Sequence, residues 1–310
     1  METPFEFRAR GRTPLGRENE PEAASEMEKA QLSYGRDAWR RLKQNKAALV
    51  SMYIIIFIIV AAVCGPLLSP YSYTKQSLMM QNTPPSPQHW FGTDNVGRDL
   101  LVRCLYGARI SLTVGIFATL ISLTIGVLYG GIAGFSGGKT DNLMMRIVDA
   151  FYAIPLLLWV ILLMVVLKPG LQNILIAIGI TYWLSMARIV RSQVLSLKEQ
   201  DYILAARAIG ASKMRIILRH LIPNNIGPIL VTATFNIPQA IFTESFLSFI
   251  GLGVGAPMAS WGMLASDALS GLRSFPYQLF FPAVAICLTM LAFNFFGDGL
   301  RDALDPRMRK

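Results

Sequence analysis

Two long stretches of this chain contain no charged side chain, and they restrict its possible folds more than any other feature. Residues 47–68 form an uncharged run of 22 residues, and residues 110–135 form one of 26. About 20 consecutive apolar residues are enough for a helix to cross the ~30 Å hydrocarbon core of a bilayer. Because no water is present there to bind backbone N–H and C=O groups, such segments must satisfy them internally as helices. The sequence therefore predicts an integral membrane protein.

Composition extends this prediction to most of the chain. Of its 310 residues, 53% are hydrophobic and 15% are charged, whereas a soluble domain carries roughly 25% charged residues. We predict an all-α fold with six transmembrane helices. The expected spans are residues 47–68, 110–135, 143–167, 171–190, 224–250 and 279–298.

The distribution of Lys and Arg predicts how these spans are oriented. Both termini and the loops on their side of the predicted membrane hold 23 of the 29 basic residues, and the other side holds six. Cytoplasmic loops carry such an excess of Lys and Arg, so both termini and residues 188–221 are expected in the cytoplasm of a multi-pass protein of the cell membrane. Nucleic-acid binding is not expected despite the net charge of +10, because the chain has no soluble basic domain.

The polar beginning of the chain differs from the apolar remainder. Residues 1–35 are rich in both charges, a composition typical of a disordered tail, and residues 36–46 form a short basic cytoplasmic segment. Residues 47–310 are predicted to form one transmembrane domain with its core at 106–298. The three cysteines and two histidines show no metal-ligand spacing, so neither a metal nor another cofactor is expected.

The most informative segment lies between the fourth and fifth spans, at residues 196–221. We expect a helix that begins at Tyr202 with Asp201 as its N-cap, because the residues that follow favour helix. Gly210 is expected to end this helix in a left-handed conformation. Ser212 then caps a second helix, so the segment reads as helix–glycine–helix.

A loop of this length is more than a connector between spans, which needs only a few residues. Ala205 and Ala206 on the first helix, and Ala211 after the glycine, are small enough to let another protein approach closely. We therefore expect the loop to dock a partner protein. The alternative is an amphipathic helix that lies on the lipid headgroups.

The same loop resembles the signature loop of ABC importer permeases, because Ala205-Ala206 is followed by Gly210 and, thirteen residues later, by Pro223. In that family the loop is the coupling helix, which sits in a groove of the ATPase subunit. The family pattern opens with glutamate, and this chain has Leu204 there.

Further motifs, in order along residues 35–310, resemble the oligopeptide, dipeptide and nickel permeases of that family. They are Phe91-Gly-Thr-Asp94, Gly97-Arg-Asp99, Tyr106-Gly-Ala-Arg109, Met145-Arg146-x-x-Asp149, Ile154-Pro155-Leu156, Ala187-Arg188-x-x-Arg191, Glu244-x-x-Leu247, Ser260-Trp261-Gly262 and Gly297-Asp-Gly-Leu-Arg-Asp-Ala-Leu-Asp-Pro306. The length of the chain and its polar N-terminus resemble the second of the two permease subunits.

This resemblance implies a MetI-like importer fold and a set of partners. They are a homologous second permease, two cytoplasmic ATP-binding subunits, an extracytoplasmic substrate-binding protein and the membrane lipid. The chain has no nucleotide-binding motif of its own, so it is not expected to be an enzyme, and ATP hydrolysis would belong to the separate subunits. Oligopeptides or dipeptides are the expected cargo, with a nickel chelate as the alternative.

Three residues within the spans are candidates for the translocation path or its gate: Asp149, Pro155 and Glu244. Charged residues inside a membrane usually have a function. For Asp149 we favour a structural ion pair with Arg146, three residues earlier on the same helix face, which would hold the end of the helix. The alternative for Glu244 is a surface side chain that extends to the headgroups.

Gly126, Gly130 and Gly134 recur at every fourth position of the second span. This pattern favours close packing against another helix, and the alternative is glycine exposed to lipid.

Two other classes of membrane protein are alternatives to the importer permease. A secondary transporter driven by an ion gradient usually has internal repeats, and a membrane enzyme needs clustered acid–base or metal-binding residues. The sequence shows neither feature.

The predicted orientation can be tested by thiol labelling. Cysteines introduced at Ser86 and Ser270 should react in intact cells with a reagent that cannot cross the membrane, because both positions are expected outside. A cysteine at Ser212 should react only after the cells are permeabilised. Labelling of Ser212→Cys in intact cells would contradict the orientation.

Overall fold

The structure is a computed structural model that describes residues 35–167, 170–255 and 257–305. These residues form helices joined by loops, and the one β-type contact among them is an isolated bridge between Thr93 and Asp99. Five helices are long and apolar enough to cross a membrane, or six if a bent pair counts as one span. The all-α prediction is therefore confirmed. The tail predicted to be disordered lies, except for Gly35, outside the described residues.

Most helices follow one another along the chain with short connections, and the longest connection is the loop between α2 and α3. An unlabelled helix at residues 35–44 comes first. The long helices are α2 (Lys46–Leu68), α3 (Leu100–Ile121), which continues through the π-helical η2 (Ser122–Gly126) into α4 (Val127–Ser136), then α5 (Gly138–Tyr152), α6 (Leu156–Val166), α7 (Leu171–Leu197), α11 (Ile226–Phe249) and α13 (Tyr277–Leu304). The short ones are η1 (Leu78–Met80), α8 (Asp201–Ala208), α9 (Lys213–Ile216), η3 (Ile217–Leu221), α10 (Ile222–Asn224), α12 (Trp261–Ala268) and η4 (Leu269–Gly271).

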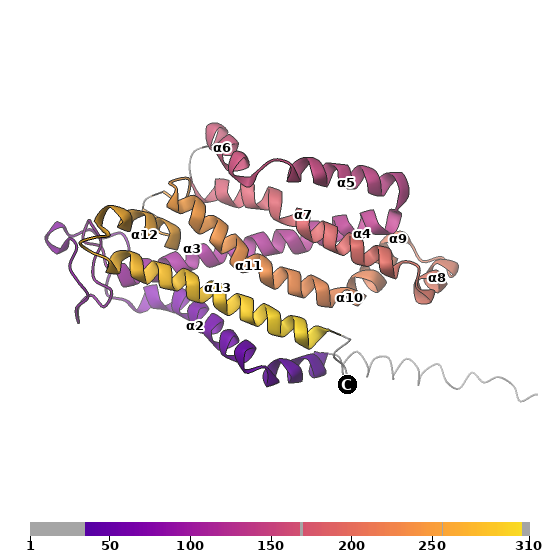
Figure 1. Ribbon diagram of the computed structural model, residues 1–310, viewed down its shortest axis with the longest axis horizontal. Coiled ribbons are helices and arrows are strands. Elements are labelled where there is room, and N and C mark those ends of the chain that lie inside the picture. Colours follow the sequence, from indigo (N-terminus) through magenta and orange to yellow (C-terminus); the bar gives the residue numbers. More distant parts are fainter. Residues whose placement is uncertain (1–34, 168–169, 256, 306–310) are drawn as a thin grey trace, which may run out of the picture.

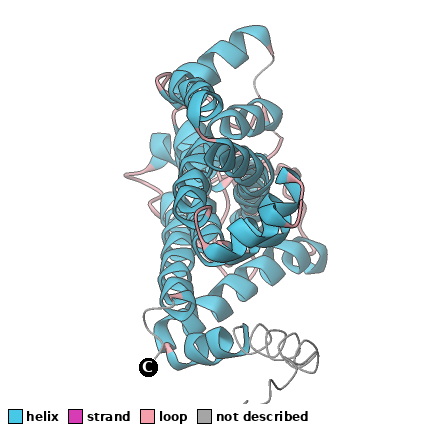
Figure 2. Cartoon of the chain, turned by 90° about the vertical axis from the view of Figure 1, so that its right-hand side faces the viewer, coloured by secondary structure: helices cyan, strands magenta, loops and turns pink. Residues whose placement is uncertain are grey.

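The long helices run side by side as an elongated bundle (Figure 1). Short α8 and α9 lie at one end, and α12 lies at the opposite end with the loop that joins α2 to α3. Helices α5 and α6 cover one edge, and α2 and α13 form the other. Figure 2 looks along the bundle from the end that carries α8 and α9. The two ends of the described chain meet, because Leu42 and Ala303 share a small apolar cluster.

The second span begins ten residues before its predicted start, because two arginines in it are accommodated by the protein. Asp99 caps the helix, and its Oδ1 accepts a hydrogen bond from the Val102 N–H at 2.9 Å. Arg103 in the first turn is fully buried and bonds to Asp94. The uncharged run 110–135 marks only the part of the helix where no such partner is required.

Arg109 is the second of these arginines, and it repairs a defect in the neighbouring helix. Pro66 inside α2 has no N–H, so the Ala62 carbonyl lacks its usual helical donor. The Arg109 Nε donates to that carbonyl at 3.3 Å, and Nη2 donates to the Val63 carbonyl at 3.0 Å. Backbone groups left unpaired in lipid cost several kcal/mol each, so this bond ties α2 firmly to α3.

The third predicted span is a broken helix. Helices α5 and α6 meet at an angle of 76°, and Pro155 stands at the break with an extended backbone (φ −56°, ψ 140°). Proline removes a helical donor and disfavours a helical residue before it. The bend therefore follows from the sequence Ile154-Pro155.

The glycine pattern of the second span is explained by α7. A Cβ placed on Gly126 would lie 2.8 Å from the Trp183 carbonyl oxygen, and one on Gly134 would lie 2.8 Å from that of Arg191. At Gly130 a Cβ would overlap the Ala187 carbonyl. The stripe thus lets the two backbones touch, so the packing interpretation is confirmed and its partner is α7.

Substitutions at two adjacent glycines should separate this packing from helix propensity. Gly130→Ala should destabilise the protein by roughly 1–3 kcal/mol, because the added methyl collides with backbone. Gly131→Ala is the matched control, since its Cβ would meet no backbone and only the Cγ2 methyl of Ile217 at 3.1 Å. Thermal unfolding in detergent measures both. Equal unfolding temperatures for the two variants would contradict the packing.

Candidate functional site

The loop between α7 and α11 has the predicted helix–glycine–helix form. Helix α8 ends before Gly210, whose φ of +81° lies in the left-handed region that glycine favours. The Ser212 hydroxyl accepts a bond from the Arg215 N–H at 3.4 Å and so caps α9. One detail of the prediction is wrong. The N-cap of α8 is Gln200, whose side chain makes no capping hydrogen bond, and Asp201 is the first helical residue. The negative charge of Asp201 interacts favourably there with the positive end of the helix dipole.

Helix α8 has one face buried against its own chain. Ile203 is fully buried and Ala206 is 7% exposed, and both belong to a core cluster that includes Val190 and Val194 of α7 and Ile216 of α9. Ala206 therefore faces its own core, and only Ala205 of the alanine pair is exposed. The sequence could not distinguish the two, because both are small and adjacent. Ala211 is half-buried and packs against the same cluster.

The opposite face of the loop exposes large apolar side chains. Ile209 is 85% exposed, and Tyr202, Leu204 and Met214 are each 40–46% exposed. Several large apolar side chains gathered on a loop are typical of a surface that contacts another protein. Sequence reasoning selected the small residues and overlooked Leu204, Ile209 and Met214. Because these three residues stand five positions apart and across the turn at Gly210, helical periodicity alone does not group them.

Two ion pairs hold α5 against the C-terminal part of α7, next to this loop. Arg191 binds the carboxylate of Asp141 with two hydrogen bonds, from Nε at 2.5 Å and Nη2 at 2.6 Å. The Arg188 Nη2 lies 2.7 Å from the Asp149 Oδ1. The predicted pair of Asp149 with Arg146 on the same helix is therefore wrong. An arginine of the adjacent helix provides the partner instead, because the break at Pro155 lets α5 lie along α7.

A cleft of about 460 Å³ opens in the bundle where α6 begins, between α6, α7 and α11. Of the three residues predicted for the path or its gate, Pro155 lines this cleft, whereas Asp149 and Glu244 do not. The polar lining is uncharged, and α7 and α11 contribute Thr181, Tyr182, Ser185, Gln239 and Thr243 to it, beside Tyr152 of α5. The hydroxyls of Tyr182 and Thr243 lie 2.8 Å apart and join α7 to α11.

These five residues of α7 and α11 were not identified from the sequence. Hydroxyl and amide side chains are common in transmembrane helices, where they often bond between helices. Their convergence on one space depends on the rotation of α7 relative to α11. The usable signal would have been the Ile154-Pro155 break next to polar positions spaced at 181, 182 and 185.

Glu244 is enclosed by protein, so the surface interpretation of this residue is wrong. It is fully buried, and its two carboxylate oxygens accept bonds from the hydroxyls of Ser111 on α3 and Ser248 on α11, both at 2.8 Å. The bond to Ser111 joins α11 to α3 near the end of the bundle that carries α12, and the bond to Ser248 lies within α11.

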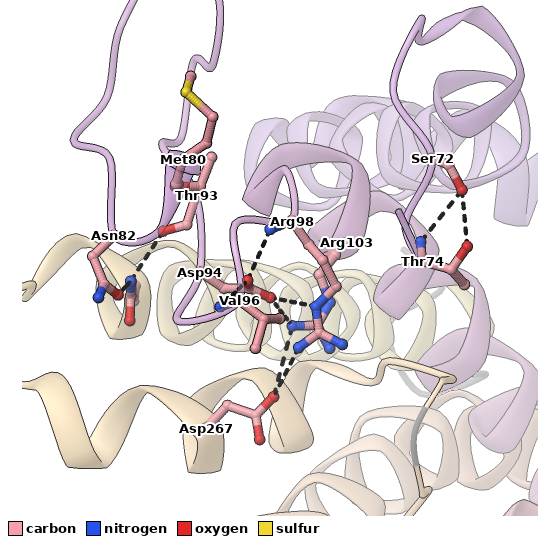
Figure 3. Close-up of polar contacts among 11 residues, drawn as sticks. Ser72, Thr74, Met80, Asn82, Thr93, Asp94, Val96, Arg98, Arg103 and Asp267 are labelled. Atoms are coloured by element: carbon pink, nitrogen blue, oxygen red, sulfur yellow. Dashed lines mark hydrogen bonds and ion pairs between the residues drawn. The ribbon is translucent and has the colours of Figure 1, made fainter. Parts of the chain in front are cut away.

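A second charged cluster lies at that end (Figure 3). Asp94 accepts hydrogen bonds from the backbone N–H groups of Val96 and Arg98 at 3.0 and 2.9 Å, and it pairs with the side chains of Arg98 and Arg103. Asp267 of α12 lies 3.6 Å from Arg103. Burial raises the pKa of the Asp267 carboxyl, and the two arginines oppose that rise. The cluster ties the α2–α3 loop to α3 and α12.

Comparison with known sequences identifies the family of this protein. The profile of the binding-protein-dependent transport system inner membrane component family matches residues 126–310. A second profile, the N-terminal transmembrane domain of oligopeptide transport permease C, matches residues 33–85. The chain belongs to the inner-membrane permeases of binding-protein-dependent transport systems. The first match contains the α8–α9 loop and the cleft.

Permeases named for peptide transport are similar over nearly their whole length. The dipeptide transport system permease protein DppC of Bacillus subtilis is 54% identical over 297 residues, which cover 96% of this chain and 92% of DppC. The oligopeptide transport system permease protein OppC of the same organism is 54% identical over 287 residues, covering 93% and 94%. OppC of Escherichia coli K12 is 42% identical over 279 residues, covering 89% and 92%.

A solved structure shows the same fold. A chain of the inward-facing methionine ABC transporter MetNI superposes with a TM-score of 0.55 at 19% identity, covering 66% of this chain and 96% of that chain. The predicted MetI-like fold class is confirmed.

Proposed function

We propose that this permease is the C-type membrane subunit of an ATP-driven importer of peptides. The observation that carries the proposal is the 54% identity, over nearly the full chain, to permeases named for dipeptide and for oligopeptide transport. Equal identity to both leaves the length of the peptide open. A nickel chelate is a less supported cargo, because the relatives reported above are named for peptides.

In the proposed assembly, this subunit pairs with a homologous permease, and an extracytoplasmic binding protein delivers the peptide. Two ATP-binding subunits dock from the cytoplasm, on the exposed surface formed by Tyr202, Leu204, Ala205, Ile209 and Met214. Both termini are then cytoplasmic. The adjacency of Leu42 and Ala303 supports the part of this proposal that puts the two ends on one side of the membrane, and the excess of Lys and Arg on that side supports the cytoplasm.

The cleft at Pro155 is the proposed part of the translocation path that belongs to this subunit. Its lining suits a peptide, because hydroxyl and amide groups can bond to any peptide backbone and carry no charge that would select one side chain. A neutral lining also avoids the cost of unpaired charge in the membrane. Peptides of different sequence can then pass through one site.

Helix α7 provides a direct mechanical connection between the two sites. It carries Thr181, Tyr182 and Ser185 of the cleft, then Arg188 and Arg191, and it ends at Leu197 just before α8. A displacement of the loop by nucleotide-driven closure of the ATPases therefore reaches the cleft through one continuous helix. The cleft changes its accessible side when the two states exchange, as expected for a two-state element biased by a ligand.

The docking surface can be tested at its most exposed residue. Ile209→Glu should abolish co-purification of the ATP-binding subunits and uptake of labelled peptide, because a charge replaces the apolar centre of the contact. Its unfolding temperature should not change, since the side chain is 85% exposed. Ile209→Leu is the control and should behave like the wild type. Unchanged co-purification by Ile209→Glu would show that the ATPases bind elsewhere.

The path is tested separately by narrowing the cleft. Gln239→Trp should reduce peptide uptake roughly tenfold, the effect of ~1.4 kcal/mol, while co-purification of the ATPases stays intact. Phe242→Trp on the same helix is the matched control, because Phe242 is half exposed and does not line the cleft. Equal uptake by both variants would exclude the cleft from the path.

A further inference from the structure

The short helix at residues 35–44 presents a basic face that the proposed transport mechanism does not use. Arg36, Trp39, Arg40 and Lys43 are all exposed and follow a three-to-four-residue period, which places them on one face. Trp39 is 46% exposed. Lys43 lies over its ring, with Nζ 5.1 Å from the ring centroid.

The opposite face of this helix is anchored to the bundle. Leu42 is 5% exposed and packs with Ala48 of α2 and Ala303 of α13, and Ala38 lies against the same cluster. The basic face is therefore held in a fixed orientation. Asn45 separates the helix from α2, because its backbone is extended and its side chain caps α2 through the Ala48 N–H at 3.2 Å.

The charges on the basic face are available to a partner. Among the described residues, the one ion pair of this helix joins Arg41 to Asp37 at 3.0 Å, and Arg41 is not part of the exposed stripe. Three cationic side chains thus remain, beside an exposed indole. Trp is enriched at the membrane–water interface, where its apolar ring and polar N–H suit the headgroup region.

The helix is followed, after Asn45, by the exposed apolar surface of α2. On α2, Val50, Tyr53 and Phe57 are 56–70% exposed. α2 is the most apolar span of the chain, and little of it is buried by protein. The basic face therefore lies where the lipid-facing surface of α2 reaches the end of the bilayer.

From these contacts we infer that residues 36–46 form a binding surface for anionic phospholipid headgroups, with Arg36, Arg40 and Lys43 as phosphate ligands and Trp39 as the interfacial anchor. Basic residues next to a membrane attract anionic lipid over a distance of about one Debye length, ~8 Å at physiological salt. The surface would recruit anionic lipid around α2 and α13, whose cytoplasmic ends it touches.

The test measures lipid enrichment around the full-length chain in nanodiscs. A fluorophore is attached to a cysteine at the exposed Gln44, after the exposed Cys64 and Cys287 are replaced by serine. Phosphatidylglycerol with brominated chains is then titrated into phosphatidylcholine. Quenching should be half-complete at a lower fraction of phosphatidylglycerol than of brominated phosphatidylcholine.

The triple variant R36Q/R40Q/K43Q should weaken this preference about fivefold for each charge removed. Its unfolding temperature should stay the same, because Leu42 and the Arg41–Asp37 pair are retained. The matched control is K139Q/R146Q/R219Q, which removes three exposed charges elsewhere and should quench like the wild type.

The inference is overturned if the wild type and the R36Q/R40Q/K43Q variant are quenched equally. It is also overturned if the two brominated lipids quench the wild type equally. If the variant is quenched like the wild type and has also lost the co-purified ATPases, the basic face is a contact with protein instead.

Discussion

The contact between α4 and α7 determines where the functional parts of this permease lie. Three glycines of one stripe, one at the end of η2 and two in α4, let this helix touch the backbone of α7 at Trp183, Ala187 and Arg191. Packing is the main force between helices in a membrane, because lipid offers no hydrophobic drive for their association. The rotation and height of α7 follow from this contact. They in turn place the cleft residues at 181–185, the arginines at 188 and 191, and the start of α8.

Charged and neutral polar groups have different roles in this bundle. Within its helices, Glu244 is bonded to serines, Arg109 to backbone carbonyls, and Arg188 and Arg191 to aspartates. An unpaired charge in a membrane is costly, so these residues build the frame. The cleft contains hydroxyl and amide groups instead. Groups that can exchange hydrogen bonds with a moving solute without a large electrostatic penalty are suited to a passage.

Part of the α8–α9 loop could be predicted residue by residue, because its signals are local. Gly210 adopts its positive φ and Ser212 its cap through bonds within a few residues. Which of Ala205 and Ala206 is buried, and which is exposed, is not decided by local sequence. It depends on how α8 lies against Val190 and Val194 of α7. The same is true of Asp149, whose pairing with Arg188 requires α5 to lie beside α7.

The sequence by itself determined that the chain is a bundle of membrane helices, that the third span contains a proline, and that the α7–α11 loop is helix–glycine–helix. It also located the spans, although the second helix starts ten residues earlier than predicted and the fourth and sixth end seven and six residues later. These properties follow from the cost of burying charge and unpaired backbone in lipid, and from conformations that single residues prefer. Only the tertiary structure decided which helix the glycines contact, which acid each arginine binds and which side chains meet in the cleft. Those outcomes depend on helix rotation and crossing, because a span without a strongly polar face can pack by any of its sides until its neighbours fill the space.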